Sequence, residues 1–95
     1  MSQYAIVLTK TYRKSFKKIS RSGRHADIKR LEEVISTLAY GQSLPEKYKN
    51  HTLSGDLAEY EECHIKDDML LVYMRHDKEL ALVLVDVGSH RDIFK

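Results

Sequence analysis

The stretch EYEECHIKDDMLLVYMRHDKELALVLVDVG, residues 59–88, decides the fold class of this chain. It contains three segments with strand character, at residues 59–66, 69–74 and 80–87. Side chains in the first segment alternate between two faces, and the other two are nearly continuous apolar runs, as expected of interior strands. The connections at 67–68 and 75–78 are short and polar, so the three strands should form an antiparallel meander.

Upstream of this stretch the sequence predicts a strand followed by an amphipathic helix. Residues 4–8 are apolar and β-prone, and Thr9 or Thr11 can cap the helix that follows them. Aromatic and aliphatic side chains recur on one face of that helix, at Tyr12, Phe16 and Ile19. We expect this face to point toward the core and the basic face to point outward.

A second helix is predicted at residues 27–40, after a break that contains Gly23 and before a stop at Gly41. Residues 42–55 read as a long loop, and residues 89–95 as a short tail. The element order is therefore βααβββ, an α+β fold with an antiparallel sheet and both helices packed on one face. The first strand must join the sheet, because an isolated strand leaves its backbone unpaired. The other face stays open for a site.

Length and composition limit the classes of protein to which this chain can belong. Ninety-five residues make one small domain, 1–95, and the longest apolar run, residues 80–85, is far too short to span a membrane. The first residues show no signal peptide. A single cysteine, Cys63, excludes an internal disulfide framework and fits a reducing environment. We therefore expect a cytoplasmic protein that does not associate with membranes.

Charge is distributed unevenly along the chain. Residues 1–50 hold 11 Lys/Arg and 4 Asp/Glu, a balance of +7, whereas residues 51–95 hold 5 and 10, a balance of −5. Part of the basic excess forms a stripe at helical spacing along the first helix, at Lys10, Lys14, Lys17 and Arg21. Two interpretations stay open: an electrostatic footprint for a polyanion such as RNA, or a solvated helix face.

Three histidines could meet on the open face of the sheet. His51 lies in the long loop, His64 in the strand at 59–66, and His90 just after the last strand. Asp68 follows His64 by four residues, and Phe94 follows His90 by four. Imidazole titrates near neutrality, so two histidines can act as base and acid at one pH. Cleavage of RNA by its own 2′-OH needs such a pair and does not require a metal.

A zinc site is the main chemical alternative, because imidazole and thiolate are zinc ligands. The candidates are His51, Cys63, His64 and His90. Cys63 and His64 are adjacent on a strand, however, and should point to opposite faces. No Cys-x-x-Cys or His-x-x-x-His spacing occurs, so no metal or other cofactor is expected and Cys63 is predicted to be a small core residue.

The second half of the chain resembles the YafQ family of type II toxins, within the RelE/ParE superfamily. The matching motifs are Leu-Pro-x-x-Tyr-x-x-His-x-Leu-x-Gly from Leu44, Tyr-x-x-Cys-His-Ile-x-x-Asp-x-Leu-Leu-Val-Tyr from Tyr60, and Gly-Ser-His-x-x-Ile-Phe from Gly88. The resemblance implies a toxin that enters the ribosomal A site, cuts the message there without metal and inhibits translation. It also implies neutralisation by a cognate antitoxin in a toxin–antitoxin complex.

The resemblance also assigns residues to roles. His90 would be the general acid. His51, His64 and Asp68 would share the roles of general base and of orienting the substrate. Phe94 would support or stack the message. Independently of the resemblance, the charge of the basic stripe predicts that Lys10, Lys14, Lys17 and Arg21 bind the ribosome and its RNA, with a solvated helix face as the alternative.

Two positions depart from the family pattern. Asp86 stands where the family usually has arginine, and Met69 stands where tryptophan is frequent. A carboxylate at position 86 would repel phosphate, so Arg91, Arg75 or Lys95 would have to supply the missing positive charge. The departures keep two other classes open: a ParE-like toxin that acts on DNA gyrase, and a catalytically weakened module that binds RNA or antitoxin.

Overall fold

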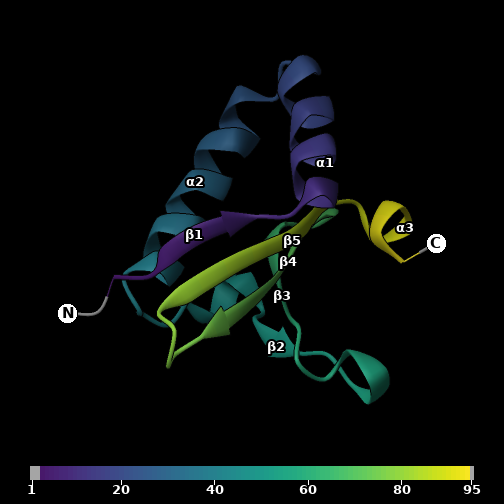
Figure 1. Cartoon of the computed structure of the whole chain (residues 1–95). Coiled ribbons are helices and arrows are strands. Elements are labelled where there is room, and N and C mark those ends of the chain that lie inside the picture. The colour runs from purple at the N-terminus through teal and green to yellow at the C-terminus, as the bar shows by residue number, and fades with distance from the viewer. Residues whose placement is uncertain (1–2, 95) are drawn as a thin grey trace.

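The computed structural model describes residues 3–94 and contains a five-stranded sheet in the order β1-β5-β4-β3-β2 (Figure 1). The strands are β1 Ala5–Leu8, β2 His51–Thr52, β3 Glu61–Lys66, β4 Met69–His76 and β5 Ala81–Gly88. The α-helices are α1 Lys10–Arg21, α2 His25–Ala39 and α3 His90–Ile93, and two 3-10 turns are η1 Glu46–Tyr48 and η2 Gly55–Leu57. The predicted α+β class is confirmed.

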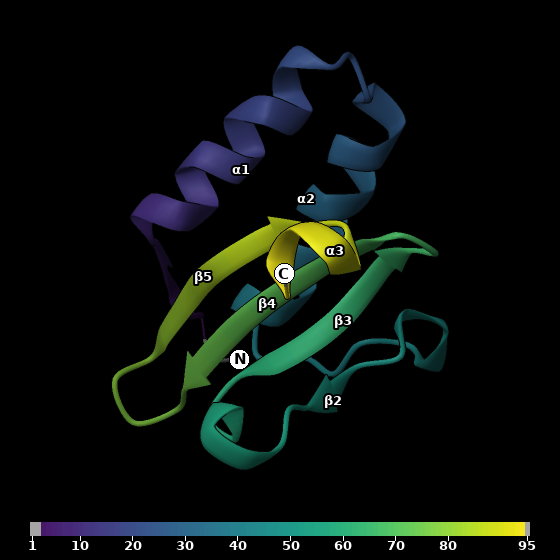
Figure 2. The same ribbon diagram turned by 90° about the vertical axis from the view of Figure 1, so that its right-hand side faces the viewer.

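Helices α1 and α2 form where the apolar periodicity predicts them and lie on the same side of the sheet (Figures 1 and 2). The Thr9 hydroxyl caps α1 by accepting a hydrogen bond from the Tyr12 N–H at 3.0 Å. Gly23 adopts φ +75°, a conformation open to glycine, and lets the chain reverse between the helices. Within residues 3–94, no helix combines the length and apolar character needed to cross a membrane.

The sheet differs from the expected four antiparallel strands in two ways. Strand β1 pairs with β5 in parallel, with Ala5 opposite Ala81 and Leu8 opposite Leu84. Parallel neighbours need a long crossover, and the α1–α2 pair begins that crossover directly after β1. The fifth strand, β2, arises within the predicted loop, where two residues pair antiparallel with β3. The predicted meander of β3, β4 and β5 is confirmed.

The core lies between the sheet and the two long helices. Alternate strand residues, such as Cys63, Leu71 and Leu82, point toward buried α2 side chains such as Leu31 and are themselves fully buried. The opposite face is only partly open. There α3 lies in front of β4 and β5 (Figure 2). This short helix occupies most of the predicted tail and leaves the rest of that face accessible for a site.

Candidate active site

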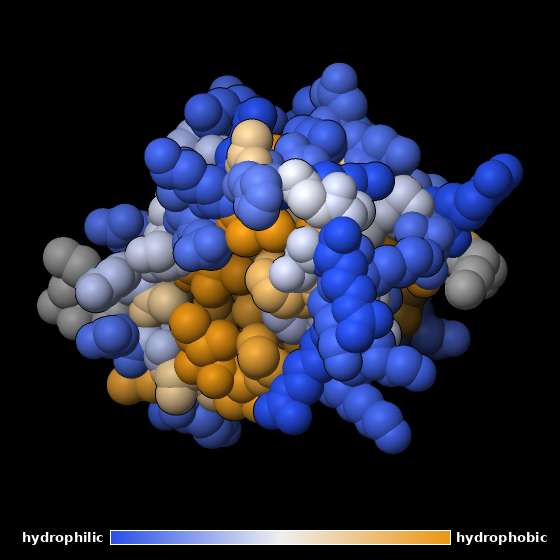
Figure 3. Space-filling model, turned by 90° about the horizontal axis from the view of Figure 1, so that it is seen from above, coloured by the Kyte–Doolittle hydropathy of each residue, from blue (hydrophilic) through white to orange (hydrophobic). Residues whose placement is uncertain are grey.

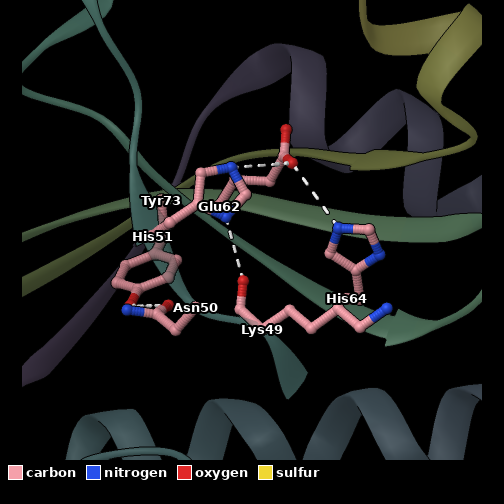
Figure 4. A network of polar contacts seen from close by, with 6 residues as sticks. All are labelled: Lys49, Asn50, His51, Glu62, His64 and Tyr73. Carbon is pink, nitrogen blue, oxygen red and sulfur yellow. Dashed lines mark hydrogen bonds and ion pairs between the residues drawn. The ribbon is translucent and has the colours of Figure 1, made fainter. Parts of the chain in front are cut away.

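A buried carboxylate lies between two histidines on the sheet face away from α1 and α2 (Figure 4). Glu62 is 5% exposed and sits directly opposite His51 in the β2–β3 pairing. Its Oε1 lies 3.4 Å from Nε2 of His51 and 3.8 Å from Nε2 of His64. The two imidazole rings are 6.4 Å apart. We call His51, Glu62 and His64 the Glu62 cluster.

His51 is oriented through its second ring nitrogen. Nδ1 lies 2.9 Å from the carbonyl oxygen of Lys49, an atom that can only accept, so Nδ1 carries a proton (Figure 4). Lys49 adopts the left-handed conformation, with φ +49° and ψ +45°. Nε2 is then the nitrogen that faces Glu62 and is free to take up a proton. The carboxylate would stabilise the imidazolium that forms.

The short strand β2 is held in place from the core side. The buried Tyr73 hydroxyl donates to Oδ1 of Asn50 at 2.6 Å, and the Asn50 amide donates to Oε1 of Glu61 at 3.0 Å. Burial, together with the nearby Glu61 carboxylate, raises the pKa of Tyr73, so its hydroxyl stays protonated and keeps donating. These contacts fix the residue before His51 and therefore the position of the imidazole.

His90 is the first residue of α3, and Phe94 directly follows this helix. The Ser89 hydroxyl caps this helix by accepting from the Asp92 N–H at 3.1 Å, and the His90 and Phe94 rings are 5.0 Å apart. In the sheet, His64 pairs with Leu70, which pairs with Gly88. Adjacent strands are about 4.8 Å apart, so His90 begins α3 two strands away from His64, beside the same open face.

Asp68 takes a different position from the Glu62 cluster. It is exposed in the turn between β3 and β4 and lines a cavity of about 420 Å³ near the end of α1. The same cavity is lined by Lys18, Arg24, Ser89 and Asp92. Of the expected acid–base residues, the structure therefore brings His51 and His64 together. His90 begins α3 two strands away from His64, and Asp68 lines a separate cavity.

Asp86 is held by its own local contacts. Its Oδ1 accepts from the Ser15 hydroxyl at 2.6 Å and from the Val87 N–H at 2.8 Å. The register between β4 and β5 shifts here, because Val72 pairs with Asp86 while Tyr73 pairs with Leu84. Such a bulge re-aims a side chain, and here it directs the carboxylate toward α1.

The residues expected to replace the missing arginine are not equivalent. Arg75 donates to the carbonyls of Leu38 at 3.2 Å and Gln42 at 3.1 Å, so it caps the end of α2 away from the histidines. Arg91 is exposed on α3 next to His90. Lys95 lies outside the described residues. Of the two described arginines, Arg91 is the one adjacent to a candidate catalytic group.

The basic stripe of Lys10, Lys14, Lys17 and Arg21 is exposed along α1. Seen from above, hydrophilic side chains flank an apolar patch (Figure 3). The β1 residues Ile6, Val7 and Leu8 are exposed although they are apolar. No acidic residue occupies the first turn of α1. Cations at a helix N-terminus oppose the helix dipole, so Lys10 does not stabilise the helix by this effect.

Cys63 is fully buried on the core side of β3, whereas His64 lies on the other face. Burial, with smaller contributions from Glu62 and Glu61, raises the pKa of the Cys63 thiol to about 12. The thiol is therefore protonated at neutral pH and packs as a small apolar group. Among the described residues, no group of three or more His, Cys, Asp or Glu is arranged to hold a metal ion.

Glu62 is a residue of this site for which no role was predicted from the sequence. Strand alternation already places it on the same face as His64, which is the one signal available without coordinates. Its pairing with His51 could not be predicted, because the two-residue strand β2 lies inside a segment with loop composition.

Comparison with known proteins places the chain among bacterial toxins of type II toxin–antitoxin systems. The family model described as "Bacterial toxin of type II toxin-antitoxin system, YafQ" matches residues 4–95. The mRNA interferase toxin YafQ of Escherichia coli K12 is 32% identical over 72 residues, which cover 75% of this chain and 76% of that protein. The chain belongs to the YafQ family.

Two groups of solved structures share the fold. A metal-bound toxin from Helicobacter pylori superposes with a TM-score of 0.87 at 41% identity, over 96% of this chain and 99% of that one. YafQ in the E. coli DinJ–YafQ toxin–antitoxin complex gives a TM-score of 0.85 at 30% identity, over 98% and 99% of the two chains.

Proposed function

We propose that this protein is a cytoplasmic endoribonuclease that cuts messenger RNA in the ribosomal A site and so inhibits translation. A cognate antitoxin would neutralise it in a hetero-oligomeric complex. The Glu62 cluster carries the proposal, because two imidazoles 6.4 Å apart share one buried carboxylate on an accessible sheet face. Membership of the YafQ family and the names of its relatives support the same class of reaction.

The reaction begins with a proton transfer from the ribose 2′-OH to an imidazole. The 2′-oxygen then attacks the adjacent phosphorus, and the bond from phosphorus to the 5′-oxygen breaks. A second group protonates the departing 5′-oxygen, which leaves a 2′,3′-cyclic phosphate and a 5′-hydroxyl. Nucleophile and phosphate belong to the same strand, so the reaction needs no metal to deliver the nucleophile.

We assign each residue of the site a role in this reaction. Nε2 of His51 or His64 takes the proton, and Glu62 stabilises the resulting imidazolium. His90 is the general acid, and Phe94, packed against it, supports the message. Arg91 contributes positive charge beside His90, and Asp68 orients substrate from the β3–β4 turn.

Mapping message ends in cells tests the proposed function. Inducing the wild-type protein should produce cuts in phase with codons, and His90→Ala should abolish them. His76→Ala is the matched control, because His76 is an exposed histidine at the far end of β4 and should leave the cuts unchanged. Intact messages together with arrested replication would instead indicate action on DNA gyrase and would overturn the proposal.

A further inference from the structure

The face that carries the Glu62 cluster also holds an apolar cavity of about 320 Å³. Its walls come from the loop after β2, from α3 and from the start of α1, and its floor comes from β4 and β5. Its lining residues include Thr9, Thr11, Tyr60, Asp86 and Phe94. Its volume falls in the range of about 300–1,000 Å³ that is usual for small-ligand sites.

Two aromatic residues from distant parts of the chain line this cavity. Tyr60 comes from a loop that closes on itself, since the Leu53 N–H donates to the Tyr60 carbonyl and the Tyr60 N–H donates to the Leu57 carbonyl, both at 2.9 Å. Phe94 comes from the end of α3, where its ring packs against His90. Aromatic rings bind unpaired bases by stacking, which tolerates any base.

One acidic side chain in the lining, that of Asp86, can distinguish one kind of base from another. Asp86 uses Oδ1 for both Ser15 and Val87, and no donor within residues 3–94 occupies Oδ2. A carboxylate repels phosphate, so a favourable partner for Oδ2 must be a hydrogen-bond donor. The exocyclic amines of adenine, cytosine and guanine are such donors, whereas uracil has no amine and presents carbonyl oxygens beside its single N–H.

We propose that this cavity, which we call the Asp86 pocket, binds one unpaired base of the message and that Asp86 selects an amino-bearing base, namely adenine, cytosine or guanine, over uracil. The proposal rests on the proposed nuclease function and deepens it. Thr9 and Thr11 line the pocket on either side of Lys10 in the sequence, and under the proposal this first residue of the basic stripe meets the phosphate backbone. Asp86 is then a specificity residue, in a position where the family usually has arginine.

Binding of uncleavable RNA tests the pocket separately from catalysis. The probes are 2′-O-methyl tetranucleotides of adenine, cytosine or uracil, titrated into the wild-type protein and into Asp86→Asn. The wild type should bind the adenine or the cytosine probe about tenfold more tightly than the uracil probe. Asp86→Asn keeps an oxygen that can accept from Ser15 and Val87 and places an amide donor at the other position, so the preference should disappear or reverse in favour of uracil.

Two further variants separate the contributions of stacking and charge. Phe94→Leu should weaken all probes to a similar degree. Glu79→Gln makes the same change of charge in the exposed turn before β5 and should keep the wild-type ranking.

Equal affinity of the wild type for all probes, or an unchanged ranking in Asp86→Asn, would overturn the assignment even if messages are cut. If the ranking of probe affinities depends on Asp86 but the protein cuts no message, the assignment of the pocket stands and the nuclease proposal is overturned.

Discussion

His64→Ala and His51→Ala are each expected to slow message cleavage on purified ribosomes by about 10²–10⁴-fold, the usual contribution of a positioned acid or base. Both imidazoles face the same Oε1 of Glu62, at 3.8 Å and 3.4 Å. Removing either ring therefore removes a proton acceptor from the proposed reaction centre. The measurement is the single-turnover rate of cleavage across a range of pH, with His76→Ala as the control for loss of an exposed histidine.

The Glu62→Gln variant distinguishes an effect of the Glu62 charge on the two histidines from a role of Glu62 in folding alone. Glutamine keeps the size of the side chain but removes the charge that stabilises an imidazolium, so cleavage should slow and the pH dependence of the rate should change. A purely structural role would lower the amount of folded protein and leave the shape of the pH–rate profile unchanged. Wild-type rates in both histidine variants would show that the Glu62 cluster is not the reaction centre.

Replacing all four cations of the basic stripe with glutamine should weaken ribosome binding and reduce its dependence on salt. Each phosphate contact adds roughly 0.7 to the slope of log K against log salt for a single strand, so four contacts predict a slope lower by roughly 3. The stripe is exposed along α1. Binding measured across a salt series gives the slope directly.

The control for the stripe compares matched pairs of substitutions. Lys14→Gln with Arg21→Gln removes one lysine and one arginine from the stripe, and Lys29→Gln with Arg30→Gln removes the same charges from exposed positions on α2. The stripe pair should reduce the slope by roughly 1.4, and the α2 pair should not. Equal effects of the two pairs would mean that overall charge, and not the stripe, governs binding.

Much of the fold follows from local patterns in the sequence. The long apolar runs predict β4 and β5, and the threonine after the first apolar run predicts the cap of α1, because these elements are stabilised by their own neighbours. The parallel pairing of β1 depends on where α1 packs, and β2 depends on its alignment with β3. Helix α3 is four residues long and shows no periodicity.

The candidate histidines could be named from the sequence, but their arrangement and the part played by Glu62 could not. Three histidines and their role in RNA cleavage could be proposed from chemistry alone. The position of Glu62 between His51 and His64 requires the two-residue strand β2, which only the tertiary structure specifies. Likewise, nothing local indicates that a bulge turns Asp86 toward Ser15.

The chemical identity of the cut ends tests the central claim most directly. Purified wild-type protein would be given ribosomes loaded with a defined message, and both ends at the cut would be analysed. Attack by the ribose 2′-OH predicts a 2′,3′-cyclic phosphate on the upstream fragment and a 5′-hydroxyl on the downstream fragment. It also predicts that a single 2′-deoxy substitution at the cut prevents cleavage. A 3′-hydroxyl paired with a 5′-phosphate would contradict the account.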